Sequence, residues 1–94
     1  IIMDPPAYGH GPTGEVWDFY KHFPALLDHC KQLLSDKPLF LIVNAYAISA
    51  SSLMLKNMLL EVGNEEGIEM GELALKESES DRLLSTGIFG RVSF

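Results

Sequence analysis

Two consecutive prolines near the start of the chain are the feature that most constrains its fold. Residues 1–3 are Ile-Ile-Met, a short apolar run, and Asp4 separates this run from Pro5 and Pro6. Each proline holds φ at roughly −65° and lacks the backbone N–H that a continuing strand would use. We therefore predict a buried strand that ends at Asp4 and is followed by a rigid turn.

An aromatic residue and a glycine-rich segment follow the turn. Tyr8 comes four residues after Asp4, and residues 9–14 contain three glycines and a proline. This composition predicts a loop rather than a continued strand or helix. A carboxylate at the C-terminal end of a strand lies at the edge where open α/β sheets bind ligands. The sequence therefore places a candidate site at residues 4–10.

The next segments predict a helix and a central strand. Residues 15–34 carry apolar side chains at helical spacing, and Pro24 predicts a kink or break near Phe23, with a second helix starting at the proline. Residues 39–43 are five consecutive apolar residues, typical of a parallel strand covered on both faces. We expect Asn44 to end this strand. In the resulting β-α-β unit, Asp4 and Asn44 would lie on one edge of the sheet.

The rest of the chain predicts one more helix and two strands. Serines precede an apolar stripe at residues 54–62, and Gly63 is a natural helix stop. Residues 68–75 are expected to be a strand, and the segment 83–94 ends in an expected last strand at residues 87–94. The polar segment 76–82 connects the two as an antiparallel hairpin. The predicted class is α/β, with parallel strands that end in an antiparallel hairpin.

The succession of these segments resembles a known family. D-P-P-A-Y at residues 4–8 resembles motif IV of the class I S-adenosylmethionine-dependent methyltransferases, in which D-P-P-x-[FY] follows an apolar strand. Residues 9–17, the helix and residues 39–46 are similar to a bacterial family related to the large-subunit ribosomal RNA cytosine-5 methyltransferases. The resemblance spans nearly all 94 residues. It implies that residues 1–94 are the C-terminal half of one Rossmann-like methyltransferase domain, a fragment that lacks the cofactor-binding N-terminal half.

The resemblance also implies roles for individual residues. Asp4 and the Pro5 carbonyl would orient a planar acceptor base and touch the methionine end of S-adenosylmethionine, while Tyr8 would stack on the base. Asp4 equally fits a carboxylate that caps the turn, and Tyr8 a lid residue that packs on the helix. The candidate substrate contacts are Pro6, His10, Asn44 and Tyr46. Asn44 and Tyr46 also fit plain strand caps.

One feature of the related ribosomal RNA enzymes does not occur in this chain. The cytosine-5 enzymes attack the pyrimidine with a cysteine just after the strand that matches residues 39–44, where this chain reads Asn44-Ala45-Tyr46-Ala47. The single cysteine, Cys30, lies on the apolar stripe of the expected helix and is interpreted as a core thiol. The covalent route is therefore disfavoured, and transfer to a nitrogen atom remains open.

Charge and cysteine content bear on partners and location. Thirteen acidic residues against seven Lys and Arg give a net charge of −6, which repels polyphosphate. We therefore expect RNA to be gripped mainly by the missing half. One cysteine excludes an internal disulfide and fits the cytoplasm, and the three histidines have no metal-ligand spacing. No apolar run approaches the ~20 residues of a membrane span. The rival hypothesis is a non-catalytic α/β protein-interaction module, and a homo-oligomer is left open.

Overall fold

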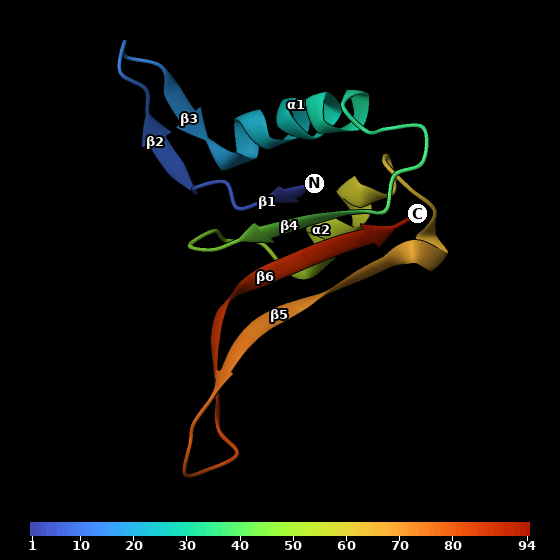
Figure 1. Ribbon diagram of the computed structural model, residues 1–94. Coiled ribbons are helices and arrows are strands. Elements are labelled where there is room, and N and C mark those ends of the chain that lie inside the picture. The colour runs from blue at the N-terminus through green and yellow to red at the C-terminus, as the bar shows by residue number, and fades with distance from the viewer.

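The computed structural model describes residues 1–94 and contains six strands and two α-helices (Figure 1). Their order is β1 (Ile2–Met3), β2 (Tyr8–His10), β3 (Val16–Asp18), α1 (Phe19–Gln32), β4 (Phe40–Ala45), α2 (Ser52–Leu59), the 3-10 helix η1 (Glu65–Gly67), β5 (Ile68–Lys76) and β6 (Leu83–Ser93). Four strands form one sheet in the order β1-β4-β6-β5, and β2 pairs with β3 in a separate two-stranded sheet.

The main sheet contains both predicted strand arrangements. β1 is parallel to β4, with Ile2 opposite Ile42 and Met3 opposite Val43, as the β-α-β prediction requires. β6 is antiparallel to both β4 and β5. The final hairpin is therefore confirmed, but its second strand lies between β4 and β5, an order that the sequence did not predict.

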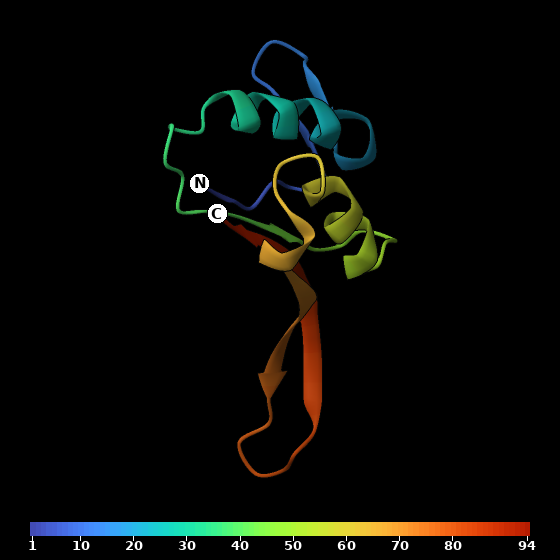
Figure 2. The same cartoon turned by 90° about the vertical axis from the view of Figure 1, so that its right-hand side faces the viewer.

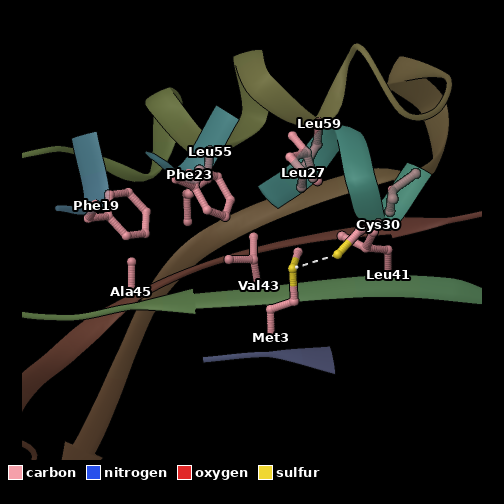
Figure 3. Packing of buried hydrophobic residues seen from close by; sticks show 11 residues of the cluster. Met3, Phe19, Phe23, Leu27, Cys30, Leu41, Val43, Ala45, Leu55 and Leu59 are labelled. Carbon is pink, nitrogen blue, oxygen red and sulfur yellow. Dashed lines mark hydrogen bonds between the residues drawn. The ribbon is translucent and has the colours of Figure 1, made fainter. Parts of the chain in front are cut away.

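Both helices cover the same face of the sheet. Met3, Val43 and Gly90 are successive partners across β1, β4 and β6, so they share one face. Met3 contacts Cys30 of α1, and a Cβ added at Gly90 would meet Leu55 of α2. Figure 3 shows the side chains of α1 and α2 together over β4. The prediction that β4 is covered on both faces is therefore wrong for these 94 residues.

The core lies between the two helices and this face. Phe19 and Phe23, one helical turn apart, stack with ring centroids 4.6 Å apart and are both 1% exposed. Burying one such side chain contributes ~1.5–3 kcal/mol. The Cys30 thiol is 7% exposed and donates a hydrogen bond to Met3 Sδ, with the sulfurs 3.2 Å apart (Figure 3). Cys30 is therefore a core thiol, as predicted.

The opposite face of the sheet is open. Ile2 is 69% exposed, Phe40 is 39% exposed and Ile42 is half-buried, and all three point away from the helices. The apolar run in β4 thus alternates in burial along its length. A continuous apolar run predicts two covered faces, but the two helices of this chain cover only one of them.

The first helix differs from its prediction at both the start and the middle. It begins at Phe19, and the Asp18 side chain caps it by accepting a hydrogen bond from the Lys21 N–H at 3.2 Å. Pro24 lies inside an unbroken helix. The expected break is absent because the stacked Phe19 and Phe23 pack the turn before the proline firmly against the core.

The β5–β6 hairpin extends past the rest of the sheet as a two-stranded ribbon (Figures 1 and 2). β4 pairs with β6 only from Ile88 to Ser93, so residues 83–87 have no partner in β4 and, except for Thr86, pair with β5 alone. The ladder shifts register between Leu73 and Ala74. The polar connection predicted at residues 76–82 is confirmed, except that Lys76 still belongs to β5. The predicted apolar stripe is confirmed in α2, where Leu55 and Leu59 are buried, but the helix ends at Leu59 rather than just before Gly63.

Candidate functional site

The site begins where β1 and β4 run toward the same edge of the sheet. Asp4 follows Met3, and Asn44 follows Val43, which is the partner of Met3. The two polar residues therefore lie at the same level, as the sequence predicted. The expected end of the strand at Asn44 is wrong, because β4 continues to Ala45 and Asn44 pairs with Phe89 of β6.

The double-proline turn is held by the segment that leads into α1. Pro5 is buried and Pro6 is exposed. The Pro6 carbonyl accepts a 2.6 Å hydrogen bond from Trp17 Nε1, and the Ala7 carbonyl accepts one from the Phe19 N–H at 3.0 Å. Since prolines cannot donate from the backbone, these carbonyl acceptors are the groups that fix the turn.

The segment after the turn is a short hairpin rather than a loop. β2 and β3 are antiparallel, with Tyr8 opposite Asp18 and His10 opposite Val16, so only residues 11–15 remain irregular. In that tip, Thr13 donates hydrogen bonds to the Glu15 carboxylate from its hydroxyl and from its N–H. These bonds lower the pKa of Glu15 below its usual 4.5. The loop prediction is corrected because short-range pairing overrides the glycine content.

Tyr8 and His10 lie on the same side of β2 and face solvent. Tyr8 is 57% exposed, and its hydroxyl lies 3.2 Å from His10 Nε2. The two rings meet edge to face, with centroids 5.1 Å apart. The Tyr8 side chain is therefore largely accessible from solvent. The predicted stacking role of Tyr8 and the substrate role of His10 stay predictions.

Trp17 and His22 support this region and were not predicted as a pair. Their rings lie 5.7 Å apart at a tilt of 32°, and His22 Nδ1 accepts a 2.9 Å hydrogen bond from the Asp18 N–H. They therefore fix the junction of β3 and α1, on which the proline turn depends. The signal in the sequence is Asp18, a typical N-cap residue, which marks where the helix starts.

Tyr46 lies in a different part of the edge from Tyr8. It is 46% exposed in the loop between β4 and α2, where Ala47 adopts a positive φ of 53°. The Ser49 N–H of the same loop donates a 2.5 Å hydrogen bond to the Tyr20 hydroxyl of α1. Tyr46 lines a surface cavity with residues of β5 and β6, and neither Tyr8 nor His10 contributes to that cavity. Asp4, Pro5, Pro6, Tyr8 and His10 are neighbours along the chain, and Asn44 lies level with Asp4, whereas Tyr46 lines a separate cavity.

The structure contains neither a cluster of metal-binding side chains nor a membrane-spanning helix. No group of three or more His, Cys, Asp and Glu side chains is placed so that it could hold a metal ion. No helix is long and apolar enough to cross a membrane.

The comparison with solved structures supports the fold. No protein-family model and no curated protein matches the chain. A solved structure of the SAM-dependent methyltransferase from Agrobacterium tumefaciens matches with 37% sequence identity and a TM-score of 0.87. The match covers 98% of this chain and 32% of that chain, so this chain spans about a third of that protein's length. In sequence and in fold, these 94 residues are therefore similar to about one third of a SAM-dependent methyltransferase.

Proposed function

We propose that this chain is the acceptor-side part of a Rossmann-like methyltransferase domain that uses S-adenosylmethionine to methylate a nucleic-acid base. The observation that carries the proposal is the placement of D-P-P-A-Y (residues 4–8) directly after β1, beside Asn44 of β4. The 37% identity to a SAM-dependent methyltransferase supports it. We further propose that the substrate is ribosomal RNA and that the protein acts in the cytoplasm.

The residues of the turn fit a planar acceptor. The Asp4 carboxylate is exposed and belongs to none of the chain's ion pairs, so it is free to accept a hydrogen bond from an amino group on the base. The Pro5 carbonyl, on a backbone fixed by the proline rings, offers a second acceptor. Stacking on the exposed face of Tyr8 contributes ~1–3 kcal/mol.

S-adenosylmethionine supplies an electrophilic methyl group when it is bound. The residues described here orient the acceptor and hold its nucleophilic atom in line with that group, and such positioning provides most of the acceleration. The chain carries no cysteine near residues 44–47, and Cys30 is buried against Met3. The proposed acceptor is therefore a nitrogen atom of the base, which needs no covalent enzyme adduct.

Binding of the nucleic acid as a whole is proposed to rely on basic surfaces outside these residues. The chain carries a net charge of −6, and nucleic-acid affinity comes largely from Lys and Arg on phosphates. On this proposal, the described residues recognise the base and other parts of the enzyme hold the backbone.

The test is a methyl-transfer assay on the full product of the gene that encodes this chain. Tritiated S-adenosylmethionine is incubated with the protein and total ribosomal RNA, and incorporation into RNA is counted. Asp4→Asn is expected to lower the rate ~100-fold, because the acceptor loses its orienting group. The matched control, Asp36→Asn, makes the same change at an exposed residue of the α1–β4 connection and should leave the rate unchanged.

Calorimetric titration with S-adenosylhomocysteine distinguishes a wrong substrate from a wrong methyltransferase assignment if no transfer to RNA is seen. Binding of this product without transfer to RNA would reject the substrate and retain the methyltransferase. Neither binding nor transfer would reject the methyltransferase and leave the non-catalytic interaction module.

A further inference from the structure

A second site lies where the ribbon leaves the sheet. The cavity there has a volume of about 330 Å³. One wall comes from the end of β4 and the loop after it, and the others come from β5 and β6. The polar side chains on these walls are Tyr46, Glu72, Ser85 and Thr86. None of these residues except Tyr46 belongs to the candidate methyl-acceptor site.

Glu72, the acidic residue of this cavity, forms no ion pair with a basic residue of the chain. The other acidic residue of β5, Glu69, pairs with Arg91 on the facing strand. Glu72, in contrast, faces Ile88 and takes part in no ion pair. No Lys or Arg lines the cavity, so its charge is uncompensated.

Tyr46 and Glu72 line the same cavity because β6 passes close to the end of β4 at Gly87. A Cβ added at Gly87 would lie 2.8 Å from the Ala45 carbonyl oxygen and 3.4 Å from Tyr46 Cβ. Thr86, the residue left unpaired by the shifted register, donates a 3.0 Å hydrogen bond to the Leu73 carbonyl. The glycine and the bulge thus seat β6 against the end of β4, which positions both walls.

We propose that this cavity binds a guanidinium or primary ammonium group. The group would form an ion pair with Glu72 and lie against the Tyr46 ring, with the Ser85 hydroxyl as a further acceptor. The net charge of −6 favours cationic ligands over phosphate-bearing ones. The proposal is independent of methyl transfer, because it rests on the walls of this cavity alone.

The same chemistry can come from two sources, a free amine or the side chain of a protein. Agmatine represents the free amine, and N-acetyl-arginine methylamide represents an arginine within a polypeptide. Each is titrated into the ¹⁵N-labelled protein at millimolar concentrations, which suit one exposed ion pair with a cation–π contact. The amide signals of Ala47, Thr86 and Gly87 are expected to shift together. Shifts with only one compound identify the source.

Variants test the role of the acid and the ring. Glu72→Gln is expected to weaken binding about fivefold, and Tyr46→Ala by a similar factor, since each contact is worth ~1 kcal/mol. The matched control is Glu79→Gln, which removes the same charge from the exposed turn of the ribbon, outside the cavity. It should leave the dissociation constant unchanged.

Three results would overturn the proposal. The first is an agmatine titration in which the amide signals of Ala47, Thr86 and Gly87 do not shift. The second is equal weakening of binding by Glu72→Gln and Glu79→Gln, which would show a general charge effect. The third is equally strong binding of cytidine, a neutral ligand with an amino group, which would reassign the cavity to an uncharged base. All three variants change exposed side chains, so the folded state should persist and far-UV circular dichroism verifies it.

Discussion

Trp17 Nε1 lies 2.6 Å from the Pro6 carbonyl oxygen, and this hydrogen bond joins β3 to the turn that carries Asp4. The bond connects residues eleven positions apart and crosses from the hairpin to the site. The turn that carries Asp4 and Pro5, the proposed acceptor-binding residues, is therefore bonded to an indole outside the motif itself.

Trp17→Phe tests this link. Phenylalanine keeps an aromatic ring beside His22 but removes the donor, so the Pro6 carbonyl loses its partner. We expect the free energy of unfolding to fall by about 1 kcal/mol in urea titrations. Methyl transfer should fall more than this loss of stability explains, because the turn reorients. Unchanged transfer in a folded variant would show that the turn holds its shape without the bond.

Cys30→Ala distinguishes a core thiol from a nucleophile. The thiol is buried and bonded to Met3, so its removal should cost about 1–2 kcal/mol in unfolding while methyl transfer continues at the wild-type rate. In the folded protein, Cys30 should react with Ellman's reagent only as fast as the core opens. An inactive but folded variant would contradict the non-covalent mechanism.

The ribbon turn should respond to acid through Glu77. The Ser80 hydroxyl, and then Arg82, hold the pKa of this carboxyl below its usual 4.5 by hydrogen bonding. A lowered pKa means that the folded state prefers the ionised form. The stabilisation is therefore complete above pH 4.5 and is lost as the pH falls through the lowered pKa. Carboxyl ¹³C NMR should give a Glu77 midpoint below 4.5 that rises toward this value in Ser80→Ala.

Gly87→Ala should strain the junction between ribbon and sheet. The added methyl would lie 2.8 Å from a backbone oxygen that cannot rotate away, so the variant should lose ~1–3 kcal/mol of stability. Gly9→Ala is the matched control, since a Cβ there meets nothing within 4 Å and its φ is not positive. We expect the control to be neutral or slightly stabilised in thermal unfolding. Equal stability of both variants would show that β6 can move away from β4.

The sequence predicted the β-α-β unit and the final hairpin because their signals are local. Pro5 stops β1, the apolar run at residues 39–43 indicates β4, and the polar connection after Lys76 requires a hairpin. The alignment of Asp4 with Asn44 followed from the parallel pairing alone. This part of the candidate site could therefore be predicted from the sequence.

The remaining features depend on contacts distant in sequence. β2 and β3 are three residues each, and segments of that length carry too little alternation for a strand to be predicted from them. Pro24 stays inside α1 because Phe19 and Phe23 pack against the core. The separate cavity at Tyr46 depends on the backbone of Ala47 and on the bulge in β6, which periodicity does not encode.

The position of β6 between β4 and β5 has a consequence for how the protein is made. A ribosome releases β4 and then β5, yet neither strand pairs with the other, and both wait for the strand that is synthesised after them. Until residues 83–93 have emerged, β4 has only the two residues of β1 as a neighbour. The sheet is therefore completed from its middle by β6, and a nascent chain stalled before Leu83 would expose the unpaired edges of β4 and β5 to chaperones or to other chains.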